Sequence, residues 1–275
     1  MCHDVDSMPA VPCKAGKAIN SRRLQLTASD GCSLPAYLSV PMESPGAGVI
    51  VLPDNRGLSS FYETLSCRIA ELGNAALAID YYGRTAGAPW ARSSNFASME
   101  HLLRVTRPGL EADLAAATQF LRSVDGGNCS AVFALGFCFG GRQAYLAATL
   151  GHRLAGVIGF YGFPGAINGA AGPTARAAHM DAPVLAVWAG GDQIDHEQVQ
   201  AFLDAMTDHG VEYESVIYPG APHSFFDIKQ TEWTEASADA WKRVCGFLDK
   251  HSAVTPARGA PRTLIRESES AAHDE

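Results

Sequence analysis

The sequence lacks a long apolar run: in its 275 residues no stretch approaches the roughly 18 apolar residues of a membrane-spanning helix. The first ten residues include Asp4 and Asp6 and lack the apolar centre of a secretory signal. Lys and Arg form no run, and the formal net charge is −8, which disfavours a nucleic-acid binder. We therefore expect a cytoplasmic protein with no membrane or nucleic-acid partner.

The cysteines also lack a pairing pattern. All seven are scattered along the chain without a Cys-x-x-Cys pair, which disfavours a disulfide framework and a zinc site. No run of glycines forms a phosphate-binding fingerprint. We expect free thiols and neither a metal nor another cofactor. Hydrophobic residues make up 47% of the chain and charged residues 18%, which is typical of a soluble globular protein with a substantial core.

Between two polar ends, short apolar runs alternate with helical patterns. We expect an N-terminal arm over 1–21, a flexible C-terminal tail over 252–275 and a single domain over 22–251. The alternation predicts an α/β fold, with a mostly parallel, doubly wound sheet behind a leading hairpin. The expected strands are 23–28, 34–40, 48–52, 75–79, 131–135, 154–160, 183–188 and 212–218, and the clearest helices are 61–72, 110–121, 142–150, 196–208 and 234–249.

The most informative motif is Gly136-Phe137-Cys138-Phe139-Gly140, which has the G-x-C-x-G form of a nucleophile elbow. An expected strand precedes it and an expected helix follows it, which is the context that an elbow requires. Helix N–H groups beside Cys138 would favour a thiolate and a developing oxyanion. The alternative is a buried structural cysteine in a glycine-rich turn.

A cysteine nucleophile needs a base, and the base needs an acid that orients it. Two loops that directly follow expected strands supply them, one with Asp192 and the next with His223. The chain order Cys138, Asp192, His223 is the order of the α/β-hydrolase triad. Asp195 is close enough in sequence to compete with Asp192 for the orienting role.

Two backbone N–H groups are expected to form an oxyanion hole. One belongs to Phe139, directly after the nucleophile, and the other to Asn55 in the loop after the strand 48–52. The weakly periodic segment 81–108 is expected to form a lid or pocket wall. Aromatic side chains expected to shape the pocket are Phe61, Tyr62, Tyr81, Trp90, Phe96, Tyr161 and Phe225.

Together these motifs resemble the dienelactone hydrolase family of α/β-hydrolases, the carboxymethylenebutenolidases. The resemblance rests on residues 136–141, on Gly190-Gly191-Asp192 and on Pro222-His223-Ser224-Phe225, and it covers about residues 22–250. It implies the α/β-hydrolase fold and hydrolysis of a lactone or ester through a Cys–His–Asp triad and an acyl-enzyme.

Two positions depart from the family pattern. The resemblance implies a glutamate after the third strand that helps to activate the thiol; the nearest carboxylate here is Asp54, either this activator or a turn-capping residue. It also implies a substrate-binding arginine four residues after the histidine, where this chain has Asp227, which disfavours a dianionic substrate. The residues expected to contact the substrate instead are Arg56, Arg84, Arg92, Tyr161 and Phe225.

The predicted function is therefore hydrolysis of an activated small-molecule ester or lactone by a monomer or small homo-oligomer. The nearest alternative is a thioesterase or acyltransferase in a biosynthetic pathway, because an acyl-cysteine can also pass to acceptors other than water. A non-catalytic α/β-hydrolase that binds a ligand is a third reading.

Overall fold

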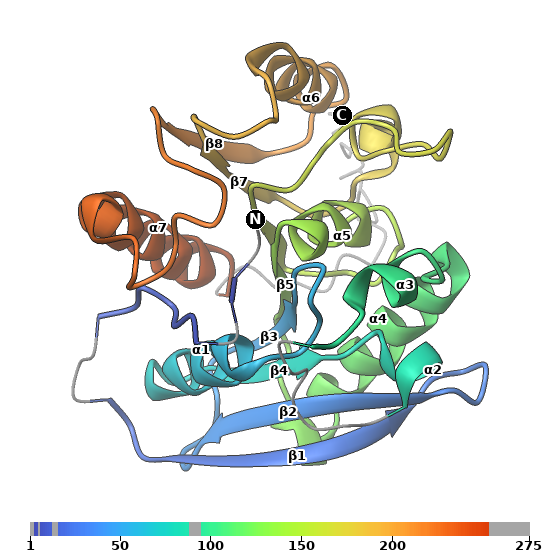
Figure 1. The fold of residues 1–275 in the computed structure, drawn as a ribbon. Coiled ribbons are helices and arrows are strands. Elements are labelled where there is room, and N and C mark those ends of the chain that lie inside the picture. The colour runs from blue at the N-terminus through green and yellow to red at the C-terminus, as the bar shows by residue number, and fades with distance from the viewer. Residues whose placement is uncertain (1–2, 5, 13–15, 88–94, 253–275) are drawn as a thin grey trace, which may run out of the picture.

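A computed structural model describes the chain except for residues 1–2, 5, 13–15, 88–94 and 253–275. In the described part an eight-stranded sheet has the order β1-β2-β4-β3-β5-β6-β7-β8 (Figure 1). The strands β1 and β2 form an antiparallel hairpin, β2 is antiparallel to β4, and every other neighbouring pair is parallel. The strands are β1 (Ile19–Thr27), β2 (Ser33–Pro41), β3 (Gly48–Leu52), β4 (Ala75–Ile79), β5 (Val132–Phe137), β6 (Gly156–Phe160), β7 (Val184–Ala189) and β8 (Tyr213–Tyr218).

The predicted mostly parallel, doubly wound sheet is confirmed. Strands β3 and β4 have the predicted bounds, and β5 continues two residues beyond the expected range, directly up to Cys138. The hairpin is longer than expected: its ladder begins with Ile19 opposite Pro41, whereas the first strand was expected to start at residue 23. Strand β1 therefore starts inside the residues expected as an N-terminal arm.

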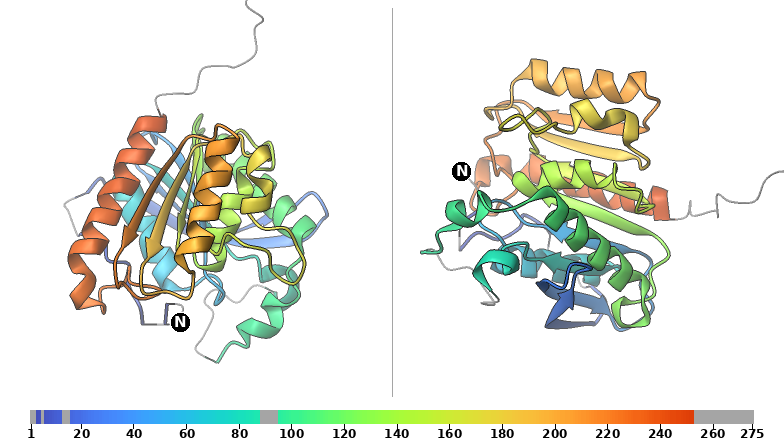
Figure 2. Two further views of the ribbon diagram at one scale, coloured as in Figure 1. Left: turned by 90° about the horizontal axis from the view of Figure 1, so that it is seen from above. Right: turned by 90° about the vertical axis from the view of Figure 1, so that its right-hand side faces the viewer.

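Helices cover both faces of the sheet (Figure 2). Along β3, Ile50 and Leu52 pack in the core under α4, α5 and α6, while Val49 and Val51 pack in the core under α1 and α7. This alternation explains why the central strands are apolar at every position. The helices are α1 (Ser60–Glu71), α2 (Gly83–Ala86), α3 (Ser98–Leu102), α4 (Arg107–Arg122), α5 (Phe139–Ala147), α6 (His196–Asp208) and α7 (Thr234–Ser252), with 3-10 turns η1 (Val124–Gly126), η2 (Thr174–His179) and η3 (Thr231–Trp233).

The segment expected as a lid or wall contains the short helices α2 and α3. Trp90 and Arg92 belong to its stretch 88–94, which lies outside the described residues. Phe96 and Leu102 pack beside a small cluster of Tyr81, Tyr82 and Leu110. Among the described helices, none has the length and apolarity to cross a membrane.

Parallel pairing brings the carboxyl ends of β3, β5, β6, β7 and β8 to one edge of the sheet. The loops that follow these strands therefore meet at this edge, the usual place of a site in an open α/β sheet. All residues that sequence analysis assigned to the triad and the oxyanion hole belong to these loops or to the start of α5.

Two glycines allow α5 to approach the sheet closely. A Cβ atom at Gly136 would lie 2.0 Å from the backbone oxygen of Gly140, and a Cβ atom at Gly140 would lie 2.1 Å from the backbone oxygen of Leu52. Both obstacles are main-chain atoms, so no change of rotamer can relieve the overlap. Glycine is required at both positions for steric reasons.

We expect Gly136→Ala to lower the free energy of unfolding by about 1–3 kcal/mol or more, because the added methyl group forces backbone atoms apart. Urea denaturation measures this change. Gly246→Ala is the matched control: Gly246 is exposed in α7 with open space around it. It should raise the stability by about 0.5–1 kcal/mol, since alanine favours a helix. Equal stability of Gly136→Ala and the wild type would contradict the steric argument.

Candidate active site

Cys138 lies at the sharp turn between β5 and α5. Its backbone has φ 55° and ψ −115°, a conformation that is unfavourable for a residue with a side chain. Two hydrogen bonds hold it: the Cys138 N–H donates to the Phe160 carbonyl (2.9 Å), and the Cys138 carbonyl accepts from the Arg142 N–H (3.1 Å). Such locally unfavourable backbone is concentrated at functional sites, where the surrounding structure maintains it.

His223 and Asp192 come from neighbouring loops and contact each other. His223 Nδ1 lies 2.5 Å from Asp192 Oδ2, and both side chains are mostly buried. Backbone hydrogen bonds from Gly190 to Tyr218 (2.9 Å) and from Gly191 to Ala221 (2.8 Å) join the two loops. Because Asp192 engages Nδ1, Nε2 is the ring nitrogen that a general base would use.

Asp195, the alternative to Asp192, has a different role. Its carboxylate caps the N-terminus of α6 by accepting a hydrogen bond from the Gln198 N–H (2.8 Å). The Gln198 side chain in turn accepts from the Asp195 N–H, which completes a capping box. Of the two carboxylates, Asp192 is therefore the one that contacts His223.

A pocket of about 450 Å³ brings the predicted residues together. Its size is within the range of about 300–1,000 Å³ that is usual for small-molecule sites. Seven residues that sequence analysis singled out line it: Asn55, Cys138, Phe139, Tyr161, Asp192, Asp195 and His223. Apolar side chains form much of the remaining wall: Leu102, Phe163, Ile167 and Ile194. Leu102 comes from α3, so the segment 81–108 does contribute to the wall.

Both residues that are expected to supply oxyanion donors line this pocket. Phe139 is the first residue of α5, so its N–H has no acceptor within the helix. The loop with Asn55 is held by two buried tyrosines: the Tyr82 hydroxyl donates to the Asn55 carbonyl (2.7 Å), and the Tyr81 hydroxyl donates to the carbonyls of Pro53 and Asp54. Burial raises the pKa of Tyr81 well above its ordinary value, so this donor stays protonated.

Sequence analysis did not identify Arg142, which also lines the pocket. Arg142 Nη1 donates to the carbonyls of Phe163 and Gly165 and so supports the wall after β6. Burial lowers the pKa of its guanidinium to about 10, which leaves it charged at neutral pH. Its place one helical turn after Cys138 was the signal that could have found it.

Two of the three predicted substrate-binding arginines, Arg56 and Arg84, lie elsewhere. Arg56 pairs with Asp4 at 2.9 Å, and Arg84 pairs with the fully buried Asp113 at 2.8 Å and with Asp30. Neither is among the residues that line the pocket. Arg84 is committed to an internal ion pair because the buried Asp113 carboxylate needs a partner.

Phe225 is fully buried and packs against the Tyr161 ring from behind, with the ring centroids 5.9 Å apart. Asp54 is also buried, and its carboxylate accepts hydrogen bonds from the backbone N–H groups of His3 (3.0 Å) and Arg56 (2.8 Å). Burial raises the pKa of this carboxyl, while His3 and these donors oppose the change. The bond to Arg56 closes a turn, as the capping alternative requires. Activation of the thiol by Asp54 remains a prediction.

His3, which sequence analysis placed in the arm, is buried beside the site. Its ring stacks on Phe61 with centroids 3.8 Å apart, and Nε2 lies 3.0 Å from the Tyr161 hydroxyl. No periodicity or motif around residue 3 indicates these contacts.

Among the described residues, no group of three or more His, Cys, Asp or Glu side chains could hold a metal ion.

Known proteins are similar to this chain in sequence. The sequence model of the dienelactone hydrolase family matches residues 34–252. A Salmonella typhi protein named "Putative carboxymethylenebutenolidase" is 31% identical over 235 residues, which are 81% of this chain and 85% of that protein. The carboxymethylenebutenolidase of Rhodococcus opacus is 27% identical over 279 residues, which cover 94% of this chain and 100% of that protein.

A solved structure agrees with these sequence similarities. The crystal structure titled "Putative Dienelactone Hydrolase" from Klebsiella pneumoniae superposes with a TM-score of 0.76 at 25% identity, and covers 85% of this chain and 100% of its own. The family match extends from β2 to the end of α7 and includes every loop at the carboxyl edge of the sheet. The chain therefore belongs to the dienelactone hydrolase family, and it is a carboxylic ester hydrolase with the α/β-hydrolase fold.

Proposed function

We propose that the protein hydrolyses an activated ester or lactone with Cys138 as nucleophile, His223 as general base and acid, and Asp192 as the residue that orients His223. The observation that carries this proposal is the 2.5 Å contact between His223 and Asp192 in a pocket that Cys138 also lines. A nucleophile, a base and an orienting carboxylate around one cavity are the parts that covalent acyl transfer needs.

The reaction has two halves. In the first, His223 takes the Cys138 proton, and the sulfur attacks the carbonyl carbon, so that a C–S bond forms and the carbonyl electron pair moves to oxygen. The N–H groups of Phe139 and Asn55 stabilise this oxyanion. The C–O bond then breaks, and His223 returns the proton to the leaving oxygen. In the second half, His223 takes a proton from water, and the resulting hydroxide adds to the thioester carbonyl. The C–S bond then breaks, and His223 returns the proton to the Cys138 sulfur.

The leaving group limits which esters react. A thiolate is a better leaving group than an alkoxide, so the first tetrahedral intermediate of an ordinary alkyl ester returns to substrate. Enol lactones, aryl esters and thioesters release a more acidic alcohol or thiol and can proceed. The proposed substrate class is therefore activated esters and lactones.

The charges of the wall favour a substrate without a carboxylate. Arg142 is the arginine among the described residues that line the pocket, and its Nη1 is engaged by two backbone carbonyls. Asp195 lines the same pocket and adds negative charge. Asp227, at the position where an arginine was expected, faces His3 rather than supplying a cation.

We expect Cys138→Ala to reduce hydrolysis of an aryl ester by at least about 10³-fold, since the covalent step is lost. Release of p-nitrophenol measures this, and Cys32→Ala, which changes a cysteine in the turn between β1 and β2, should retain full activity. Iodoacetamide should alkylate Cys138 before Cys129, because burial raises the pKa of Cys129 to about 11. Full esterase activity in Cys138→Ala would overturn the proposed function.

Asp192→Asn and Asp195→Asn form a matched pair. We expect Asp192→Asn to lower kcat by about 10²–10⁴-fold, because the amide no longer holds the correct tautomer of His223. Asp195→Asn should change kcat by less than about threefold, since asparagine caps a helix as well as aspartate does. Steady-state kinetics on one aryl ester distinguishes the variants. Similar losses in both would contradict the assignment of Asp192.

Two aryl esters that differ only by a carboxylate test the charge preference. We expect kcat/KM to be at least about tenfold higher for the neutral ester, because Asp192 and Asp195 are among the described residues that line the pocket, and Arg142 Nη1 already donates to two backbone carbonyls. The comparison is made at low ionic strength, where charge effects are largest. A preference for the acidic ester would show that Arg142 or a residue outside the described part of the chain binds an anion.

A further inference from the structure

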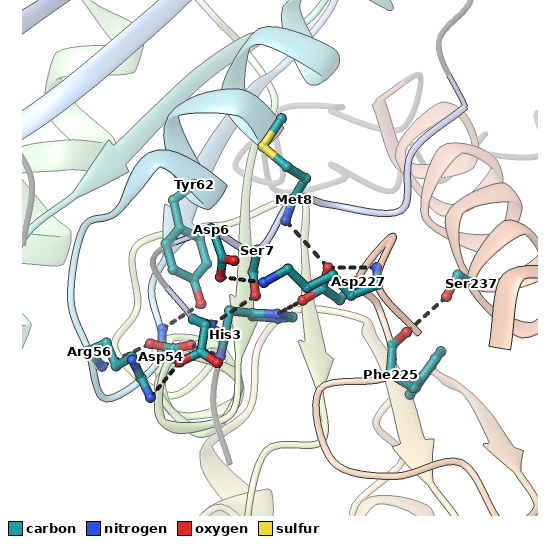
Figure 3. Close-up of polar contacts among 12 residues, drawn as sticks. His3, Asp6, Ser7, Met8, Asp54, Arg56, Tyr62, Phe225, Asp227 and Ser237 are labelled. Atoms are coloured by element: carbon teal, nitrogen blue, oxygen red, sulfur yellow. Dashed lines mark hydrogen bonds and ion pairs between the residues drawn. The ribbon is translucent and has the colours of Figure 1, made fainter. Parts of the chain in front are cut away.

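The N-terminal segment, residues 3–12 without residue 5, lies against the loop that follows His223. The Met8 carbonyl accepts a hydrogen bond from the Ile228 N–H (3.0 Å), and Pro9 forms a short antiparallel bridge with Asp227. An exposed ion pair between Asp6 and Lys229 adds to this contact (Figure 3). The segment is thus attached by backbone pairing just beyond His223.

His3 at the start of this segment contacts three loops of the site. Its backbone N–H donates to Asp54 Oδ2 (3.0 Å) after β3, and Nε2 lies 3.0 Å from the Tyr161 hydroxyl after β6. Nδ1 lies 3.9 Å from Asp227 Oδ2 after β8. The side chain is 1% exposed. The buried His3 therefore connects the loop after β3, which contains the expected oxyanion donor Asn55, with the loops after β6 and β8.

Tyr161 links His3 to the reacting groups. Its ring lies 4.7 Å from the His223 ring, centroid to centroid, and it lines the pocket. Its backbone has φ 39°, and its N–H donates to the Val187 carbonyl (2.7 Å). The Tyr161 ring also packs against Phe137 and Phe225, and its hydroxyl end meets His3. Loss of this polar contact would therefore change how the Tyr161 ring lies against His223.

The charges around His3 suit a polar ring rather than an apolar one. Burial alone would raise the pKa of Asp227, but contacts with His3 and Ser7 outweigh it and hold the pKa at about 2. Asp54 adds a second buried carboxylate on the other side of His3. Among the described residues, other ionisable groups close to this cluster are Tyr62, Tyr161, Arg56 and Lys229; Arg56 pairs with Asp4, and Lys229 pairs with Asp6.

We propose that His3 is a positioning residue of the active site: it holds the Tyr161 hydroxyl and the Asp54 loop, so that the N-terminal segment forms part of the wall that keeps His223 in place. His3 does not touch the reacting atoms in this role. This inference rests on the proposed function, because its kinetic tests measure hydrolysis by Cys138, His223 and Asp192.

The decisive variant is His3→Phe, which keeps an aromatic ring on Phe61 and removes both ring nitrogens. We expect kcat to fall about tenfold with KM changed by less than about twofold, because the binding pocket stays while His223 is less well held. The acid limb of the kcat/KM profile should move up by about 0.5 pH unit, because a less firmly held Tyr161 ring leaves the His223 imidazole more accessible to water, which stabilises its charged form.

Two further variants separate positioning from packing. Asp6→Asn breaks an exposed ion pair in the same segment, and we expect it to retain wild-type kcat and pH profile. Tyr161→Phe removes the hydroxyl that His3 contacts. In that background His3→Phe should lower kcat by less than about twofold more, because coupled residues are not additive. Should His3→Phe fail to fold, His3→Gln supplies the comparison, since the amide retains a polar atom for Tyr161 and is expected to keep more than half of kcat.

Wild-type kcat and pH profile in a folded His3→Phe, or independent multiplicative losses in the double variant, would overturn the proposal. Hydrolysis by Cys138→Ala, or its absence in the wild type, would instead overturn the proposed function. In that case the role of His3 is tested without hydrolysis, by measuring the pH dependence of Cys138 alkylation with peptide mass spectrometry. His3→Phe should shift its midpoint by about 0.5 pH unit relative to Asp6→Asn, and coincident curves would refute the role of His3.

Discussion

The site depends on the close approach of helix α5 to the ends of β3 and β5. Gly136 and Gly140 leave no room for a Cβ atom, because main-chain oxygens occupy the space. This contact forces the chain to turn within one residue, and Cys138 takes the left-handed conformation of that turn. The thiol therefore projects from the end of a buried strand, beside the first N–H groups of a helix. A less compact turn would separate the thiol from the N–H groups that we propose as oxyanion donors.

The other functional groups are held by contacts between loops rather than within them. The loops after β7 and β8 are joined by backbone hydrogen bonds and by the contact of Asp192 with His223. The loop after β3 is tied to the phenols of Tyr81 and Tyr82. Buried hydrogen bonds of this kind are stronger than exposed ones, because no water competes for the donors and acceptors. This preorganisation is what electrostatic stabilisation of a transition state requires.

Charge near the pocket differs from what the family resemblance implies. Asp227 replaces the expected arginine and faces His3, while Arg142 enters the wall from the elbow helix. Each of these side chains already has a partner within the protein: Asp227 contacts His3, and Arg142 donates to two backbone carbonyls. A substrate carboxylate would have to compete with these partners, which explains why the geometry supports the reaction class more strongly than an anionic substrate.

The amino-acid sequence by itself determined the sheet, the elbow at Cys138 and the order of Cys138, Asp192 and His223. These features are local: apolar runs define strands, and the elbow is a strand, a turn and a helix in one continuous stretch. The choice of Asp192 over Asp195 needed the tertiary structure, because both lie in one loop and only the approach of β8 brings His223 to the first.

Long-range contacts likewise decided the environment of the site. Arg84 was drawn into an ion pair with a buried carboxylate, whereas Arg142 reached the pocket. His3 and Tyr161 are 158 residues apart in sequence, and they meet because the N-terminal segment lies against the loops that follow β3, β6 and β8. Sequence periodicity reports which face of an element is buried, but it carries no information about which distant side chain lies against that face.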